Sequence, residues 1–440
     1  MKYKIPAVLL AALCISAVSC GKDTSSSENK TKKESSSVQE DTSITTSVSA
    51  EKSIIQTTTT RTKAKTTTTV TTAPKPTEPV ILGGINSVSV YEELSINGFL
   101  TEANVSILNG SDLLDTSETG EKSVTVKYLQ DGIEGEKKLT YIVEDTEAPI
   151  ILNAGWNPYH RTGTAFDLNN YVGFADNYDC NPVLTYEGDI DPNTVGDYPL
   201  TAYVTDSSGN STSFDVTISV MDSIPTPPDD RQRVDFSDFA AVYGGEGKRV
   251  GIDVSTWQGE IDWNAVRDAG CQFAVIRIGY SYGDIVMDDR FYTNIEGARA
   301  AGVDLSVYFY TTANTEDEIR EQAGWIAENL NGTPTDLPIG FDWEEFGGFQ
   351  KYGMSLRKIN DLYALFNEEM AAYGYDTMLY SSKNFLNNVW NEHSKSLSPV
   401  WLAHYVDDTD YDGSYTFWQQ SSCGRISGIY GDVDMNIMYE

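Results

Sequence analysis

Between residues 79 and 222, apolar side chains alternate with polar ones, as in strands that bury one face. The alternation is clearest on both sides of the Gly-Asn turn at 206–210, in the runs 200–204 and 214–220. Two such runs around a short turn predict a β-hairpin. A similar plan occurs earlier, over residues 119–145. We therefore predict two small all-β modules, residues 79–147 and 148–222.

After residue 249 the pattern changes, because short apolar runs typical of buried strands alternate with longer amphipathic stretches. The apolar runs are 250–254, 273–278, 305–310, 338–343, 377–380, 400–403 and 416–419. The helix-like stretches are 289–301, 316–330 and 356–373. Strand–helix alternation favours a parallel sheet, and the number of strands favours a TIM-like (β/α) barrel for 249–440. A doubly wound sheet is the alternative, but no Gly-rich phosphate turn supports it.

The remaining segments are predicted to be a signal and linkers. Residues 1–20 combine a basic start with a short apolar stretch, which indicates an export signal, and Ala17-Val18-Ser19-Cys20 resembles a lipoprotein box. The resemblance implies lipidation of Cys20, with ordinary cleavage and release as the alternative. Residues 21–78 are rich in Ser, Thr and Lys and are expected to be a disordered tether. Residues 223–248 begin with a Pro-rich run and are expected to be a linker.

Composition excludes several classes of function. With 31 Lys and Arg against 65 Asp and Glu, the net charge is −34, so the chain should repel nucleic acid. The three histidines show no zinc-ligand spacing, and no G-x-S-x-G elbow is present. We expect no metal and no cofactor. Export permits a disulfide between Cys271 and Cys423, but two free buried thiols fit the sequence equally well.

Asp342 and Glu344 are the most informative pair, because they directly follow an apolar run that predicts a strand. Residues i and i+2 of a strand point to the same face, whereas Trp343 and Glu345 should point to the opposite one. Two carboxylates side by side suit glycoside hydrolysis, in which one acid donates a proton and the other stays ionised. A solvated acidic strand end is the alternative for this pair alone.

Further motifs support the first interpretation. Residues 249–440 resemble glycoside hydrolase family 25, the N-acetylmuramidases that cut peptidoglycan. The resemblance is carried, in the family's order, by 251–255, 307–310, Asp342-x-Glu344, 379–381, Trp401-x-Ala403-x-Tyr405, Trp418-Gln419 and Val433-Asp434-x-Asn436. Residues 148–222, and more weakly 79–147, resemble the immunoglobulin-like repeats of bacterial surface proteins. Such modules are expected to act as spacers, with wall binding as the alternative.

The resemblance implies roles for individual residues. Glu344 corresponds to the general acid and Asp342 to the carboxylate that stabilises developing positive charge, while Asp253 and Asp434 line the same cleft. The side chains expected to bind sugar are Tyr280, Tyr308, Tyr310, Tyr380, Trp401, Tyr405, Trp418 and Gln419.

The whole chain is thus predicted to be a monomeric, surface-anchored muramidase that cuts the β-1,4 bond after N-acetylmuramic acid with retention. Its expected partners are peptidoglycan strands and, through Cys20, the outer face of a Gram-positive cell membrane; without lipidation it would be secreted. Two alternatives stay open: a hydrolase of another polysaccharide such as chitin, and a non-catalytic wall-binding protein.

Overall fold

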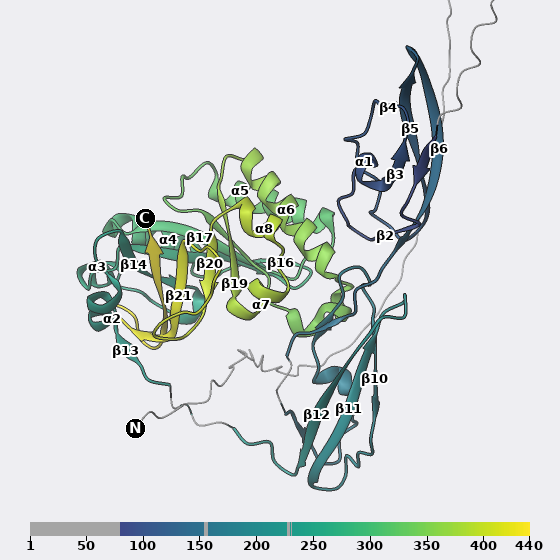
Figure 1. The fold of residues 1–440 in the computed structure, drawn as a ribbon. Coiled ribbons are helices and arrows are strands. Elements are labelled where there is room, and N and C mark those ends of the chain that lie inside the picture. The colour runs from purple at the N-terminus through teal and green to yellow at the C-terminus, as the bar shows by residue number, and fades with distance from the viewer. Residues whose placement is uncertain (1–79, 154–156, 227–228, 230) are drawn as a thin grey trace, which may run out of the picture. The chain divides into compact units, whose positions relative to one another are not determined.

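The computed structural model describes residues 80–153, 157–226, 229 and 231–440 (Figure 1). The chain divides into two units, Met1–Pro74 and Lys75–Glu440, and the described residues all belong to the second. The predicted signal, Cys20 and the tether 21–78 lie outside the described residues. Within the described part, no helix is both long enough and apolar enough to cross a membrane.

The first β module contains two sheets. The larger has the order β2 (Ser87–Ser89), β6 (Ile133–Glu144), β5 (Gly120–Gln130), β4 (Ser106–Ile107), and the smaller pairs β1 (Ile81–Gly83) with β3 (Leu100–Ala103), next to the short helix α1 (Ile96–Phe99). Its core joins Ile81 of one sheet to Val126, Tyr141 and Val143 of the other. The predicted alternation in 119–145 therefore corresponds to the β5–β6 hairpin, with Val124 opposite Leu139.

The second β module is built in the same way. Its larger sheet has the order β10 (Val183–Glu187), β11 (Gly196–Thr205), β12 (Ser211–Met221), β8 (Tyr159–Arg161), and its smaller one pairs β7 (Ile150–Ile151) with β9 (Phe174–Ala175); a 3-10 turn, η1, spans Leu168–Asn170. Strands β11 and β12 form the predicted hairpin, closed by the hydrogen bond from Asp206 N to Asn210 O. The alternating side chains Leu200, Ala202 and Val204 are buried.

The third part of the described chain is a closed ring of strands. These are β14 (Lys248–Val254), β15 (Phe273–Ser281), β17 (Asp304–Thr311), β18 (Ile339–Asp342), β19 (Thr377–Ser382), β20 (Val400–Ala403), β21 (Phe417–Arg425) and β22 (Val433–Tyr439). Neighbours from β14 to β21 are parallel. Strand β22 closes the ring by pairing antiparallel with both β21 and β14 (Figure 1). A short strand, β16 (Ile285–Met287), pairs with β15 outside the ring.

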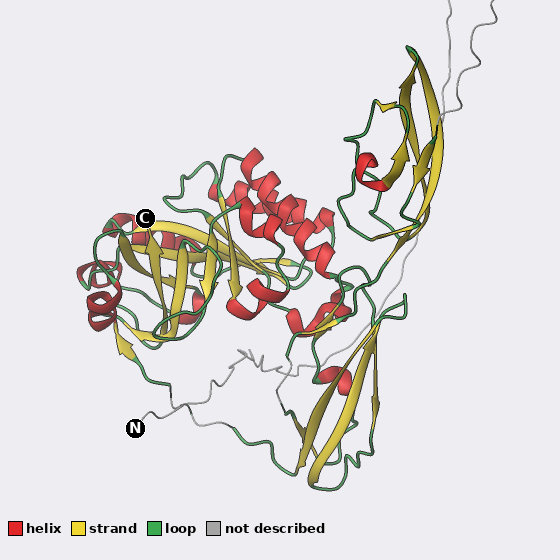
Figure 2. Ribbon diagram, viewed as in Figure 1, coloured by secondary structure: helices red, strands yellow, loops and turns green. Residues whose placement is uncertain are grey.

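Helices cover the outside of this ring, as Figure 2 shows. They are α3 (Trp263–Asp268), α4 (Phe291–Ala301), α5 (Glu316–Leu330), α6 (Leu356–Ala372), α7 (Lys383–Asn388) and α8 (Glu392–Leu397), with 3-10 segments η2 (Thr256–Gln258) and η3 (Phe346–Tyr352). A regular TIM barrel repeats strand and helix eight times with all strands parallel. Here β20 runs to β21 without a helix, and β22 is antiparallel. The predicted barrel is therefore found as a closed α/β ring, but not as a regular TIM barrel.

Two buried clusters hold the ring together. Inside it, Phe273, Met378, Trp401 and Phe417 from four different strands pack against one another. Outside it, the apolar faces of the helices pack on the strands in one continuous core. Trp343 belongs to the outer core, is 0% exposed and donates from Nε1 to the Ala313 carbonyl oxygen, as predicted from its place between the two acids.

The predicted linker 223–248 is wrong in its second half. Residues Val234–Asp235 form β13, which pairs with the end of β21, and Phe236–Tyr243 form helix α2. Phe236 and Phe239 are each 1% exposed and belong to the outer core of the ring. The sequence around 234–243 is apolar at helical spacing, but the Pro-rich run directly before it favours a linker, and the predicted linker was therefore drawn too long. The folded domain that contains the ring of strands thus begins near residue 234.

The cysteines of the described part are free. Cys271 and Cys423 are both buried, and neither forms a disulfide. Each thiol instead lies against a carbonyl oxygen, that of Phe273 at 3.2 Å and that of Gln232 at 3.4 Å. The free-thiol alternative is therefore the one found.

Phe239→Ala tests whether α2 is part of the folded ring. Removing a fully buried phenyl ring should lower the free energy of unfolding by roughly 3–5 kcal/mol. Val242→Ala in the same helix is the control, because Val242 is 70% exposed and its loss should cost less than about 0.5 kcal/mol. Urea unfolding monitored by tryptophan fluorescence measures both; equal effects would contradict the packing of α2.

Candidate active site

Four carboxyl groups meet at one end of the ring. Asp253 is the residue before the end of β14, Asp342 is the last residue of β18, and Glu344 lies two residues further on. Because β22 is antiparallel, its beginning lies beside the end of β14, and Asp434 is the Cα partner of Asp253. In parallel α/β folds, active sites form at the carboxyl ends of the strands. The four predicted acids thus come from three strands and one following loop at that end.

Asp253 is buried, and two amide groups make this burial tolerable. Its Oδ2 accepts hydrogen bonds from Asn436 Nδ2 at 2.7 Å and from Gln419 Nε2 at 2.9 Å. Burial still dominates and raises the pKa of Asp253 to about 6, against the lowering effect of the two amides. A buried carboxylate without such donors would be costlier still.

The two amides are themselves held in place. Gln419 Oε1 accepts from the hydroxyls of Tyr380 at 2.9 Å and Tyr405 at 2.8 Å, while Asn436 Oδ1 accepts from Trp401 Nε1 at 2.8 Å. Because each amide oxygen is occupied by a donor, each amide nitrogen is turned toward Asp253. The predicted residues Tyr380, Trp401 and Gln419 therefore position Asp253.

Asp342 and Glu344 differ in their surroundings. Asp342 is 6% exposed, and its Oδ1 is buried without a hydrogen-bond partner among the described residues. Glu344 is open to solvent, although the walls of the site displace much of the water around its carboxyl. Buried polar atoms are rarely left unpaired, and an exception commonly marks a functional site. The unpaired oxygen of Asp342 is such an exception.

Both groups hold their protons more tightly than usual. Burial, the charge of Asp253 and that of Glu345 raise the pKa of Glu344 to about 7, while a hydrogen bond with Tyr380 lowers it. Burial and the charges of Glu344 and Asp253 also raise the pKa of Asp342 well above its usual value, opposed by Arg277. The predicted anionic role of Asp342 is thus opposed by burial and by the nearby charges of Glu344 and Asp253, and Arg277 supports it.

Asp434 behaves in the same way. Burial raises its pKa well above the usual value, and the charges of Asp253 and Glu344 add to this effect. The pairing of β14 with β22 and the charge interactions among these side chains both show that the four acids form one electrostatic cluster.

Glu345 forms its hydrogen bond with a residue outside this cluster of four acids. Its Oε1 accepts a hydrogen bond from the hydroxyl of Tyr310 at 2.7 Å, and the ring of Tyr310 contacts that of Tyr282. Tyr282 in turn contacts Tyr280. Glu345 therefore fixes one end of an aromatic row that contains two of the predicted sugar-binding residues, Tyr280 and Tyr310.

The other predicted aromatics divide into two groups. Tyr405 is 49% exposed and Tyr308 is partly exposed, so both can contact a substrate. Trp418 cannot, since it is 3% exposed, packs against Tyr243 of α2, and donates from Nε1 to the His404 carbonyl oxygen. Neighbouring residues of a strand face opposite sides. Because Gln419 faces the acids, Trp418 faces the outside of the ring. The prediction that Trp418 contacts the substrate is therefore wrong.

Two exposed aromatics were missed by the sequence analysis. Trp257 is 78% exposed in η2, directly after the strand that carries Asp253, and Tyr282 is 62% exposed directly after β15. Both follow the strand ends at which the acids lie. Their position directly after an apolar run could have indicated that they lie near the acids. Sequence alone, however, does not distinguish an exposed aromatic side chain from a packed one.

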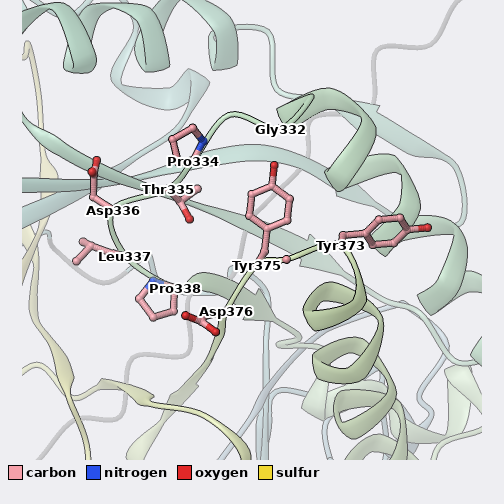
Figure 3. Close-up of a pocket in the computed structure, with 10 residues that line it drawn as sticks. Gly332, Pro334, Thr335, Asp336, Leu337, Pro338, Tyr373, Tyr375 and Asp376 are labelled. Atoms are coloured by element: carbon pink, nitrogen blue, oxygen red, sulfur yellow. The ribbon is translucent and has the colours of Figure 1, made fainter.

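A separate pocket of about 310 Å³ lies at the opposite end of the strands. Its lining includes Leu337 and Pro338 just before β18 and Asp376 just before β19 (Figure 3). Tyr375 points its hydroxyl toward the 332–334 turn in this view, and donates to the Thr333 carbonyl oxygen at 3.3 Å. Since the acids follow the far ends of the strands, this pocket is distinct from the candidate active site.

Comparisons with known proteins agree with the class of site. Residues 252–429 match the family described as "Glycosyl hydrolases family 25", and residues 154–220 match "Bacterial surface protein, Ig-like domain". The chain belongs to glycosyl hydrolase family 25. Asp253, Asp342 and Glu344 lie inside the matched segment, and Asp434 lies just beyond it.

Individual relatives are similar over the same part of the chain. Lysozyme M1 of Streptomyces globisporus is 34% identical over 201 residues, which cover 42% of this chain and 66% of that protein. The uncharacterized protein YegX of Escherichia coli K12 is 31% identical over 42% of this chain and 68% of its own length. A bacterial lysozyme structure from Streptomyces coelicolor has 30% identity, a TM-score of 0.37, and covers 44% of this chain and 92% of that one. The chain thus spans just under two thirds of Lysozyme M1.

Glu344→Gln should stabilise the protein at high pH. Between its ordinary pKa of 4.5 and its raised value of about 7, Glu344 keeps a proton in the folded state that the unfolded chain releases. The contribution of Glu344 to the free energy of unfolding is therefore greatest below about pH 4.5 and is lost as the pH rises through 7. We expect a gain of about 1 kcal/mol at pH 8, after allowance for solvent screening, and almost none at pH 4.

Denaturant unfolding at the two pH values measures this gain. Glu345→Gln removes the same charge and is the control; its carboxylate already accepts a hydrogen bond from Tyr310, so no comparable gain is expected. Equal stability of wild type and Glu344→Gln at pH 8 would contradict the crowded environment described for Glu344.

Proposed function

We propose that this protein is a peptidoglycan hydrolase that cuts the β-1,4 bond between N-acetylmuramic acid and N-acetylglucosamine. The observation that carries the proposal is the gathering of Asp253, Asp342, Glu344 and Asp434 at one end of the ring, where burial and neighbouring charge raise the pKa of Glu344 to about 7. The family and the relative named Lysozyme M1 support the choice of peptidoglycan over other polysaccharides.

Glu344 is the proposed general acid. Its pKa of about 7 keeps a large fraction protonated at neutral pH, so it can donate to the leaving oxygen of the glycosidic bond. Its exposure to solvent lets the glycan reach it. After cleavage the same carboxylate accepts a proton from the attacking water, which restores its starting state.

Asp342 is the proposed stabiliser of the reacting sugar. Its buried Oδ1 has no hydrogen-bond partner among the described residues, and the acetamido N–H of the substrate is a suitable donor for it. Positive charge that develops on the sugar favours the ionised form of Asp342. As the glycosidic bond breaks, the acetamido oxygen of the substrate bonds to the anomeric carbon. Water that gives its proton to Glu344 then attacks the same carbon and breaks its bond to the acetamido oxygen, so two inversions leave the configuration retained.

Asp253 and Asp434 are proposed to set the field of the site and to bind sugar hydroxyls. The exposed aromatics Trp257, Tyr282 and Tyr405 are proposed to stack on sugar rings, since an aromatic face gains contact area against the apolar face of a sugar.

The location of the protein is proposed to be the cell surface or cell wall. A surface Ig-like domain beside a family 25 domain supports an extracellular position. The finer proposal is a lipid on Cys20 in a Gram-positive cell, with the β modules as spacers between the lipid and the catalytic ring.

Glu344→Gln should abolish hydrolysis of purified cell walls, lowering the rate by about 10²–10⁴-fold as expected for the loss of a general acid. Glu345→Gln keeps an acceptor for Tyr310 and should retain activity within about tenfold, the effect of weakening one hydrogen bond. Loss of turbidity measures both rates. Equal loss in the two variants would overturn the assignment of Glu344.

Analysis of the products separates the proposal from its two alternatives. Mass spectrometry of fragments with N-acetylmuramic acid at the reducing end supports the muramidase. Release of other sugars from chitin but not from wall would favour a different hydrolase, and wall binding with no released fragment would favour a non-catalytic protein.

Cys20→Ala should move the protein from the detergent phase to the aqueous phase when intact cells are extracted with a phase-separating detergent. An acyl chain contributes about 0.8 kcal/mol for each buried CH₂ group, so its loss should change the partition almost completely. Ser19→Ala is the control. Aqueous partitioning of the wild type would instead support simple secretion.

A further inference from the structure

Three buried aspartates meet where the two β modules join. Asp145 directly follows β6 of the first module, whereas Asp176 follows β9 and Asp206 follows β11 of the second. One carboxylate oxygen from each lies within 4.8 Å of the other two. The three side chains are only 6%, 1% and 6% exposed. No residue of the catalytic ring belongs to this cluster.

The cluster contains oxygens that no hydrogen bond satisfies. Oδ1 of Asp176 accepts from the backbone N–H groups of Tyr178 and Asp179, but its Oδ2 is buried without a partner among the described residues. Oδ1 of Asn177 is also buried and unpaired. Oδ2 of Asp145 likewise has no hydrogen-bond partner among the described residues. Burial raises the pKa of Asp145, and the Glu147 N–H and the Asn177 amide oppose this rise.

The charge of the cluster is not compensated by the protein. None of the ion pairs among the described residues includes Asp145, Asp176 or Asp206. Burial and the charges of the other two acids raise the pKa of Asp176 to about 6. At neutral pH the site therefore gathers negative charge in a water-poor setting, which is costly without a bound cation.

We propose that Asp145, Asp176 and Asp206, with the side-chain oxygen of Asn177, bind one Ca²⁺ ion at the junction of the two β modules. Ligand oxygens about 2.3–2.6 Å from a shared Ca²⁺ lie up to roughly 5 Å from one another, which the observed limit of 4.8 Å fits. All the donors are oxygens, the class that hard cations prefer, whereas Zn²⁺ favours nitrogen and sulfur. Mg²⁺ fits less well, because it retains several waters and this site is buried.

The ion would tie together three segments that are distant in the sequence. Asn210, beside Asp206, already donates from Nδ2 to the Asp145 carbonyl oxygen at 3.0 Å, a link between the modules. The carbonyl oxygens of Asp176 and Asn177 accept from the N–H groups of Leu356 and Arg357, the first residues of α6. Binding of Ca²⁺ would therefore stiffen the joint between the modules and the loop that caps α6. This proposal does not depend on the proposed hydrolase activity.

Terbium luminescence on the full chain tests the site directly, since Tb³⁺ replaces Ca²⁺ and is excited through a nearby tyrosine such as Tyr178. After removal of metal with EDTA, wild type should show saturable emission that Ca²⁺ reverses with a dissociation constant on the order of 10⁻⁴–10⁻³ M, the range of extracellular modules. Calorimetric titration with CaCl₂ should give one site per chain. Absence of saturable binding would overturn the proposal.

Asp176→Asn is the matched variant, because asparagine keeps Oδ1 as the acceptor for Tyr178 and Asp179 and loses only the charge. It should weaken Ca²⁺ binding at least tenfold, and so should Asp145→Asn. Asp189→Asn, on the surface of the same module, should bind as wild type does. Wild-type affinity in both Asp176→Asn and Asp145→Asn would reject the assigned ligands.

Two further measurements separate this site from folding and from the active site. In EDTA, Asp176→Asn should melt at the same temperature as wild type or higher, since the variant lacks an uncompensated buried charge. Addition of 5 mM Ca²⁺ should raise the melting temperature of wild type by several degrees. The melting temperature of the variant should rise by much less. Equal shifts in both would count against the proposal. Glu344→Gln should still bind one Ca²⁺, and loss of binding in that variant would place the ion among the catalytic acids instead.

Discussion

Asp253 can be buried at the mouth of the ring only because two amide groups donate hydrogen bonds to it. Asn436 and Gln419 supply these donors, and their own oxygens are occupied by Trp401 and by two tyrosines. The network leaves neither amide free to rotate. With Asp253 fixed, its charge raises the pKa of Glu344 and of Asp342. Burial remains the largest cause of both shifts, and the uncharged amides contribute by fixing the position of Asp253.

Local patterns predicted much of the fold. The helix predicted at 316–330 is found as Glu316–Leu330, because Thr315 and Glu318 form a capping box at its start and its apolar residues share one face. The strands that carry Asp253 and Asp342 were also predicted from their apolar runs. Helix α2 was missed because a Pro-rich run precedes it. Strand β22 was not among the predicted strands, and its antiparallel direction depends on pairing with the rest of the ring.

The structure brings the four predicted acids together at one end of the ring. Asp342 and Glu344 could be paired from strand alternation, and the same rule should have separated Trp418 from Gln419. The partners of Asp253 could not be found in this way, since Asn436 lies 183 positions further along the chain. The aspartate cluster between the β modules was equally hidden, because its members lie in three loops that only the folded chain brings together.

The antiparallel strand that closes the ring also has a consequence for the order in which the chain folds. The first and last strands of the ring, β14 and β22, pair with each other, so a chain without residues 433–439 has two open sheet edges and no complete acid cluster. Contacts between such distant segments form slowly during folding. The four acids therefore form one cluster only once residues 433–439 have joined the ring.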